Sequence, residues 1–281
     1  MALCFQLTLN FELFALNILN LLNMLEVIKR EILEIEKREN IKILYACESG
    51  SRAWGFPSRD SDYDVRFIYI RPKEWYLSID DHKDTLEFPI NDLLDISGWD
   101  IRKVLKLFRS SNAVIYEWLQ SPIVYKEESD FREKLFKLSE DYFSLRTGMH
   151  HYLGMTINSF KNELQGDIVK IKKCLYALRS SLACRWIREK QTVPPMEFGV
   201  LRTLVKDEGG INGLLEQLLI RKKDNSEGDT IPASRLLNHF IQNEIRESEL
   251  YSMSLEKSIG STEILDKIFR DLLFETFKEE V

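Results

Sequence analysis

Cysteines are few in this sequence, and none of them has the spacing of a metal-binding motif. The 281 residues include four cysteines, Cys4, Cys47, Cys174 and Cys184, and no Cys-x-x-Cys pair. The sequence therefore contains no recognisable zinc motif, and scattered cysteines of this kind are typical of reduced thiols in a cytosolic protein. We expect a cytoplasmic location.

The chain also lacks an excess of positive charge. Its 39 Lys and Arg residues against 45 Asp and Glu residues give a formal net charge of −6. This balance argues against a protein dedicated to binding duplex nucleic acid, although a local basic patch could still bind a phosphate-rich partner. A hydrophobic content of 44% is enough to bury a large core, in one large domain or two smaller ones.

The N-terminal segment has no Lys or Arg before Lys29. A secretory signal would begin with basic residues, and a membrane span would not tolerate Glu12 among so many asparagines. We therefore expect no membrane partner. Two interpretations remain for residues 1–23: an apolar extension forming an amphipathic helix, or a segment that is not native because translation starts at Met24.

Hydrophobic periodicity divides the remainder into an α+β part and a helical part. Residues 24–40 have the pattern of an amphipathic helix, whereas 41–47 and 62–70 have the pattern of buried strands. A hairpin of two further strands is predicted over 84–97, and the pattern is helical from Gly98 onward, with Asn112 as an N-cap. We expect a mixed-sheet domain over 24–125 and an all-helical domain over 126–281.

The second of these strands carries two aspartates at a spacing of two. Residues at that spacing share one face of a strand, so Asp62, Asp64 and Arg66 should point the same way. Two neighbouring carboxylates repel each other, and a hard divalent cation offsets that repulsion. Arg66 has two interpretations, as a structural partner of the aspartates or as a contact to a triphosphate.

A turn of small residues, Gly50-Ser51, follows the first strand. Glycine allows close approach to the backbone, and the free N–H groups of a helix that starts there can receive an anion. Arg52 comes directly after the turn and could reach phosphates or remain solvated. A strand, a small-residue turn, a helix and a strand bearing Asp-x-Asp together indicate a site for a metal-bound nucleotide.

These motifs resemble those of a known family. The stretch "GSRAWGFPSRDSDYDV" is similar to the signature of nucleotidyltransferases of the DNA polymerase β type. With "DISGWDIRKVLKLF" and "EWLQSPIVY", the sequence resembles the YcgL group within that superfamily, which includes a phage protein associated with RNA-repair ligases. The resemblance is strongest over residues 41–125 and begins near Met24.

The resemblance implies a mixed five-stranded sheet and a transferase that moves a nucleoside monophosphate from an NTP to an acceptor hydroxyl, releasing pyrophosphate. It implies two Mg²⁺ ions, or Mn²⁺ in their place, held by three catalytic carboxylates. Asp62 and Asp64 match two of these carboxylates. For the third, Asp95 in "LLDIS" is the first choice and Glu87 in "TLEFP" is the alternative.

The helical part contains a basic stretch that could contact the substrate or the acceptor. Between Asp141 and Arg202, ten Lys and Arg residues stand against five Asp and Glu residues. Lys172, Tyr176 and Arg179 line up along one predicted helix, beside an apolar stripe. They form either a solvated flank or a nucleotide-binding surface in which the cations meet phosphate and the tyrosine stacks on a base.

Three functional hypotheses follow from these motifs. The first is an active nucleotidyltransferase whose acceptor could be RNA, in repair or modification. The second is a non-catalytic module that binds nucleotides for regulation. The third is a toxin-type transferase that modifies a protein or tRNA. The motifs favour the first because the Gly-Ser turn and the aspartate pair are both intact.

Overall fold

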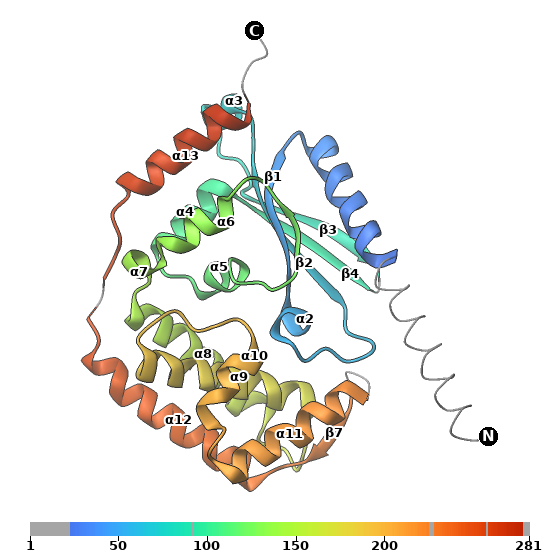
Figure 1. Cartoon of the computed structure of the whole chain (residues 1–281), viewed down its shortest axis with the longest axis vertical. Coiled ribbons are helices and arrows are strands. Elements are labelled where there is room, and N and C mark those ends of the chain that lie inside the picture. Colours follow the sequence, from blue (N-terminus) through green and yellow to red (C-terminus); the bar gives the residue numbers. More distant parts are fainter. Residues whose placement is uncertain (1–22, 92, 225–227, 257, 278–281) are drawn as a thin grey trace, which may run out of the picture.

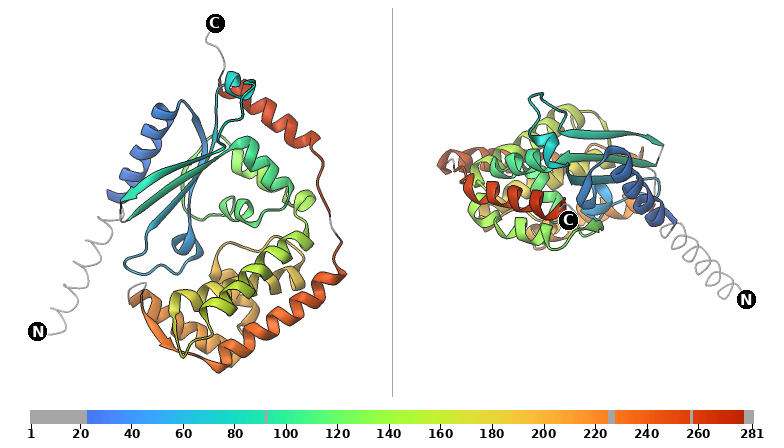
Figure 2. Two further views of the ribbon diagram at one scale, coloured as in Figure 1. Left: turned by 180° about the vertical axis from the view of Figure 1, so that it is seen from behind. Right: turned by 90° about the horizontal axis from the view of Figure 1, so that it is seen from above.

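A computed structural model describes residues 23–91, 93–224, 228–256 and 258–277. The interpretations of the N-terminal extension concern residues that, apart from residue 23, lie outside this description. The chain forms a sheet half and a helical half that pack against each other (Figures 1 and 2). The expected α+β class, with a mixed sheet followed by a helical part, is confirmed.

The central sheet has five strands in the order β3-β4-β2-β1-β5. Strands β2 and β4 are parallel, and the other neighbouring pairs are antiparallel. The predicted hairpin is present as β3 and β4. The strands are β1 (Lys42–Ser49), β2 (Tyr63–Ile70), β3 (Thr85–Asn91), β4 (Leu94–Asp100) and β5 (Val124–Glu127).

Each face of the sheet has its own apolar core, because side chains alternate along the strands. The helix of residues 23–39 covers one face, where Ile32 and Ile35 lie in a cluster with Phe67. Helices α4 and α5 cover the other face, where Ile68 is buried with Phe108 (Figure 1). The helices of this half are α2 (Gly50–Trp54), α3 (Lys73–Tyr76), α4 (Ile101–Arg109), α5 (Ala113–Trp118), α6 (Phe131–Lys137) and α7 (Ser139–Tyr142).

Side-chain caps fix where two of these helices start. The Asp100 carboxylate accepts the backbone N–H of Arg102 at the start of α4. Asn112 accepts the N–H of Val114 at the start of α5, which confirms the predicted N-cap. Asp100 is also the last residue of β4, so α4 begins directly after the strand.

The helical half has a third core, formed mainly by α8, α9, α11 and α12. It also contains a two-stranded sheet of β6 and β7, so this half is not purely helical. Ile168 lies in β6 and is 69% exposed. The elements are α8 (Leu145–Glu163), β6 (Ile168–Lys170), α9 (Ile171–Lys190), α10 (Phe198–Arg202), the 3₁₀ helix η1 (Thr203–Val205), α11 (Gly209–Asp224), β7 (Thr230–Pro232) and α12 (Arg235–Ser254).

The C-terminal helix α13 (Glu263–Thr276) returns to the sheet half (Figure 1). Leu265 is buried in the core of α4 and α5, and the ring of Phe269 meets Tyr76 at 5.0 Å between centroids. The structure thus differs from the expected division at residues 125 and 126. Strand β5 extends to Glu127, and a helix from the end of the chain completes the core of the first half.

A buried polar network joins the two halves. The Arg179 guanidinium on α9 pairs with the Glu117 carboxylate on α5 at 3.0 Å, and the Tyr152 hydroxyl on α8 donates to the same carboxylate at 2.9 Å. Arg179 also lies over the ring of Trp54 on α2, 4.3 Å from its centroid. Because buried charges are costly unless they are paired, this network fixes how the helical half meets the sheet half.

A second buried carboxylate lies inside the sheet. Glu48, near the end of β1, is fully buried, accepts the backbone N–H of Asp64 at 2.8 Å and accepts the hydroxyl of Tyr125. Burial raises the pKa of Glu48 from its ordinary value of 4.5 to about 7, although both hydrogen bonds act in the opposite direction. The side chain therefore links β1, β2 and β5 at the end of the sheet.

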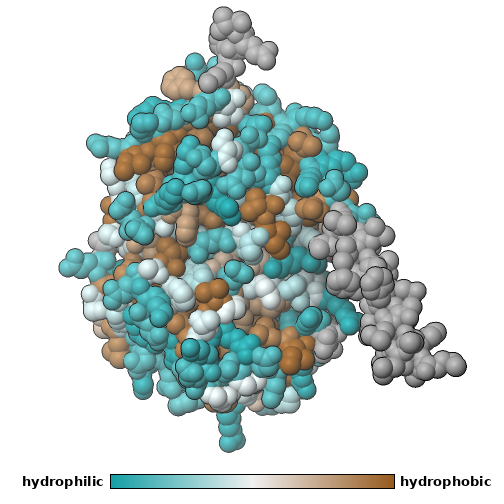
Figure 3. Space-filling view, in the orientation of Figure 1, coloured by the Kyte–Doolittle hydropathy of each residue, from teal (hydrophilic) through white to brown (hydrophobic). Residues whose placement is uncertain are grey.

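The described surface is mixed in character. On the face shown in Figure 3, apolar side chains form separate groups among hydrophilic ones. Within the described ranges, no helix has both the length and the apolar character that crossing a membrane requires.

Replacing Arg179 with Met should destabilise the protein strongly, because Glu117 would remain buried without its cationic partner. We expect urea denaturation to show a loss of about 3 kcal/mol in the free energy of unfolding. The matched control is Lys173→Met, on the same helix as Arg179. It removes an exposed ion pair with Glu163 of α8 and should lower the free energy of unfolding by less than about 1 kcal/mol. Equal losses for the two variants would contradict a structural role for the buried pair.

Glu48 should make stability depend on pH. Its pKa in the folded protein lies above that in the unfolded chain, so the folded protein retains a proton that the unfolded chain releases. The stabilisation that protonated Glu48 contributes is therefore full below about pH 4.5 and is lost as the pH rises through about 7. Without divalent cations, the wild type should lose about 3 kcal/mol relative to Glu48→Gln between pH 4.5 and pH 8. Denaturation curves that stay parallel across this range would show that Glu48 titrates normally.

Candidate active site

The Gly50-Ser51 turn joins β1 directly to α2, and its glycine is required by both conformation and space. Gly50 has a positive φ of +63°, a region that favours glycine. A Cβ at this position would lie 2.1 Å from Oδ2 of Asp64, which is far closer than atoms can approach. The turn was expected to allow close approach of an anion to the backbone, and in the structure the Asp64 carboxylate occupies the space that a Cβ of residue 50 would take.

Two carboxylates face each other across adjacent parallel strands. Asp64 on β2 is paired in register with Asp95 on β4. The Arg66 guanidinium lies between them, with Nη2 at 2.8 Å from Oδ2 of Asp95 and at 3.3 Å from Oδ1 of Asp64. Residue spacing along β2 places Arg66 on the same face as Asp64, so one cation contacts both carboxylates.

The structure distinguishes the two candidates for the third carboxylate. Asp95 lies beside Asp64, whereas Glu87 is exposed on the edge strand β3, opposite Ser97. Asp62 lies just before β2 and is exposed. Its negative charge raises the pKa of Asp64. The carboxylates that the structure brings together are therefore those of Asp64 and Asp95, with Asp62 nearby.

The electrostatics of Asp64 reflect this crowding. Burial raises the pKa of Asp64 above its ordinary value, and the negative charges of Asp95 and Asp62 raise it further. The positive charges of Arg66 and Lys172 lower it. Lys172 belongs to the first turn of α9, so the helical half contributes charge to this site.

The donor set can be tested against the divalent metals that the motifs suggest. No three His, Cys, Asp or Glu side chains among the described residues form a ready-made metal cluster. However, Mg²⁺ is commonly bound by one or two carboxylates together with phosphate oxygens of the substrate. Asp64 and Asp95 offer such a pair, in which Arg66 offsets one of the two negative charges and leaves the other for a metal. The residues therefore fit a metal that arrives with a triphosphate.

Ser51 in the turn and Arg52 directly after it have structural roles that the sequence did not indicate. Arg52 donates to the backbone carbonyls of Ser61 at 2.7 Å and Asp62 at 3.0 Å, and its guanidinium stacks 3.7 Å from the ring centroid of Tyr63. Ser51 is buried, and its hydroxyl donates to that of Ser61 at 3.2 Å. Both side chains thus hold the loop that precedes Asp62.

The three residues singled out on α9 are not equivalent. Arg179 was expected to meet phosphate, but it is 2% exposed and pairs with Glu117, so the structure contradicts that expectation. Tyr176 is half-buried, with its ring edge-on to Trp54 at 5.0 Å. Nζ of Lys172 lies 5.8 Å from the centroid of the Tyr176 ring, and its positive charge lowers the pKa of Asp64. Lys172 is therefore the cation of this helix that is near the carboxylates.

Two residues that border the site were not predicted from the sequence, Glu48 and Lys222. Glu48 holds the backbone of Asp64, and its signal was a charged residue at the end of an otherwise apolar strand. Lys222 on α11 reaches the loop before Asp62 and donates to the Ser58 hydroxyl at 2.9 Å. No local pattern marks Lys222, because its partner is 164 positions away in the sequence.

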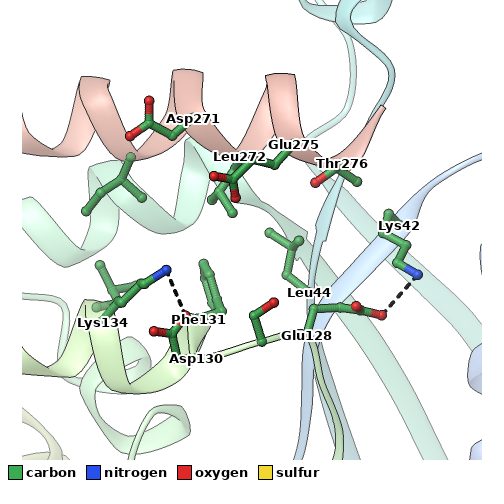
Figure 4. Close-up of a pocket in the computed structure, with 13 residues that line it drawn as sticks. Lys42, Leu44, Glu128, Asp130, Phe131, Lys134, Asp271, Leu272, Glu275 and Thr276 are labelled. Atoms are coloured by element: carbon green, nitrogen blue, oxygen red, sulfur yellow. Dashed lines mark ion pairs between the residues drawn. The ribbon is translucent and has the colours of Figure 1, made fainter. Parts of the chain in front are cut away.

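Two hollows in the surface lie away from these carboxylates. One, of about 400 Å³, lies between α13, α6 and the start of β1, and ion pairs of Lys42 with Glu128 and of Lys134 with Asp130 line it (Figure 4). The other, of about 590 Å³, lies between the helix of residues 23–39 and β3, and Glu87 lines it. The candidate site thus rests on its carboxylates and its turn and not on either hollow.

Comparisons with known proteins agree with the motifs. The sequence profile of the RNA repair pathway DNA polymerase beta family matches residues 24–271. The uncharacterized protein YcgL of Bacillus subtilis (strain 168) is 49% identical over 215 residues, which cover 76% of this chain and 83% of that protein. A solved structure of a nucleotidyltransferase-like protein from Exiguobacterium sibiricum 255-15 is 13% identical, covers 90% of this chain and 81% of that one, and has a TM-score of 0.31.

The first two matches carry the assignment, because each spans most of the chain. The matched region of the family profile includes the Gly-Ser turn and the paired aspartates. The resemblance stated from the sequence is thereby confirmed at the level of the polymerase β-like nucleotidyltransferase superfamily. The chain belongs to the RNA repair pathway DNA polymerase beta family.

Proposed function

We propose that this chain is a metal-dependent nucleotidyltransferase that moves a nucleoside monophosphate from an NTP to an acceptor hydroxyl and releases pyrophosphate. The observation that carries the proposal is the in-register pair of Asp64 and Asp95 next to the Gly50 turn. Two acidic side chains so close together are costly unless a cation accompanies them. Arg66 offsets only one of the two negative charges, so a divalent metal that arrives with a triphosphate would compensate the rest.

In this proposal the carboxylates of Asp64 and Asp95 bind divalent metal, with Asp62 as the third acidic group. Magnesium, as two ions, or manganese would supply Lewis acidity at the acceptor hydroxyl and neutralise charge on the triphosphate. Arg66 keeps the two carboxylates together before substrate enters, because it contacts both of them. A carboxylate that gives up its ion pair with Arg66 has an oxygen available for a new partner.

In this proposal, neighbouring groups bind the rest of the substrate. The turn at Gly50 and Ser51 offers backbone N–H groups to the triphosphate. Lys172 offers a positive charge from the helical half, and the exposed part of Tyr176 offers a ring face to a base or sugar. Arg52 contributes indirectly by holding the loop next to Asp62.

We propose RNA as the acceptor. The family takes its name from an RNA repair pathway, and the excess of basic residues between Asp141 and Arg202 is on the half that contributes Lys172. A hydroxyl at an RNA end would be the nucleophile that attacks the α-phosphate. A cytoplasmic protein would meet both NTP and RNA.

The experiment incubates the protein and Mg²⁺ with each α-³²P-labelled NTP and an RNA bearing a free 3′ hydroxyl. Wild type should transfer label to RNA, and Asp64→Asn and Asp95→Asn should each reduce transfer by at least about a hundredfold, because a metal ligand is lost. Both variants should remain folded, since removing one carboxylate relieves repulsion. Glu87→Gln is the matched control and should retain full transfer.

Other outcomes would support a different function or a different set of site residues. Binding of Mg²⁺-NTP by calorimetry without transfer to any acceptor would indicate a regulatory module. Label on tRNA or on protein would indicate a toxin-type transferase. Loss of transfer in Glu87→Gln but not in Asp95→Asn would show that Glu87, and not Asp95, is the acidic residue that acts with Asp64.

Gly50→Ala tests the turn. The new Cβ would collide with Oδ2 of Asp64 and would occupy a left-handed backbone position, so we expect at least a tenfold loss of Mg²⁺-NTP affinity and about 1 kcal/mol of stability. Gly55→Ala is the matched control, because Gly55 has φ +90° but no atom lies within 4 Å of the position that its Cβ would take. Equal losses of affinity in both variants would remove the contact between Gly50 and Asp64 from the site.

A further inference from the structure

A buried lysine connects the helical half to the loop in front of the aspartates. Lys222 on α11 is 1% exposed and is among the largest fully buried side chains of the described chain. Its Nζ donates to Oγ of Ser58 at 2.9 Å. Burying an ammonium group is costly unless hydrogen bonds and charges compensate, so a lysine in this position has a demanding and specific environment.

The contact continues through a chain of buried hydroxyls. Oγ of Ser58 lies 2.9 Å from Oγ of Ser61, which also accepts the backbone N–H of Ser58 at 2.9 Å. Oγ of Ser51 donates to Oγ of Ser61 at 3.2 Å. All three serines are at most 5% exposed. The chain therefore runs from α11 to the turn of small residues, and each link is within hydrogen-bond distance.

The same loop is held from its other side by Arg52. The guanidinium binds the carbonyls of Ser61 and Asp62, so the segment next to the aspartates is fixed by backbone contacts on one side and by the serine hydroxyls on the other. Arg59 and Asp60, between these contacts, are exposed. A segment anchored at its base with an exposed tip can open only if the anchors release.

We propose that Lys222 is a positioning residue for the nucleotide site, through which the helical half sets the Gly50-Ser51 turn and the loop that carries Asp62. This inference rests on the proposed function. Lys222 is too deeply buried to touch a substrate, so it acts through Ser58 and Ser61. The helical half is then needed for the shape of the phosphate-binding turn as well as for any contact with an acceptor.

Limited proteolysis tests the link without requiring activity. Trypsin cleaves after Arg59 when the loop opens, and Lys222→Met should increase the rate of this cleavage about tenfold, because a charge-assisted hydrogen bond is lost. Affinity for Mg²⁺-NTP, measured by calorimetry, should fall by a similar factor. Lys223→Met, an identical change at the exposed neighbouring lysine, is the matched control and should alter neither quantity. Cleavage and affinity unchanged in Lys222→Met would overturn the proposal.

Ser58→Ala provides a second variant in case Lys222→Met fails to fold. It removes the acceptor of the lysine and should open the loop to a similar extent. In the double variant the increase should be smaller than the two single increases combined, because both changes break the hydrogen bond between Lys222 and Ser58. Additive effects would show that the residues act independently and would also overturn the proposal. If wild type binds no Mg²⁺-NTP, the proposed function fails, while the cleavage rates still decide whether Lys222 holds the loop.

Discussion

The site depends on one electrostatic constraint, which is that two carboxylates are held face to face. The parallel pairing of β2 with β4 sets Asp64 beside Asp95, and the register of the sheet fixes the backbone positions from which both side chains extend. Arg66 contacts both carboxylates from the same face and offsets one of their two negative charges. The neighbouring structure follows from this arrangement. Gly50 has no side chain because a Cβ would strike Asp64, and Glu48 is buried where it holds the Asp64 backbone. Local repulsion is thus tolerated because the sheet supplies the rigidity and because positive charge is close at hand.

The two halves form one functional unit through polar contacts rather than apolar ones alone. Glu117 from the sheet half pairs with Arg179 from the helical half, and Trp54 lies against that guanidinium. Lys222 reaches Ser58 in the loop before the aspartates. Hydrogen-bonded charges in a low-dielectric interface have strict geometry, so they fix the relative position of the halves more narrowly than side-chain packing would. This precision suits a site whose acidic groups come from one half and whose nearby Lys172 comes from the other.

Much of the sheet half could be predicted because its signals are local. The alternation of residues along β2 predicted that Asp64 and Arg66 share a face, and their ion pair is consistent with that orientation. The predicted hairpin appeared as β3 and β4, and Asn112 caps α5 as predicted. The helical half was less predictable. A helical pattern indicates which residues can share a face, but it does not reveal what lies opposite that face, which is why Arg179 was wrongly expected to reach phosphate.

The sequence by itself determined the chemistry that is available: a glycine where the chain turns, aspartates at a spacing of two, and a neighbouring arginine on the same strand. These depend on backbone geometry within a few residues, which the local sequence specifies. Only the tertiary structure decided that Asp95 rather than Glu87 joins Asp64, that Arg179 is buried against Glu117, and that Lys222 supports the loop. Strand register and burial depend on partners far along the chain, and a choice between two carboxylates on neighbouring strands is settled only when those strands pair.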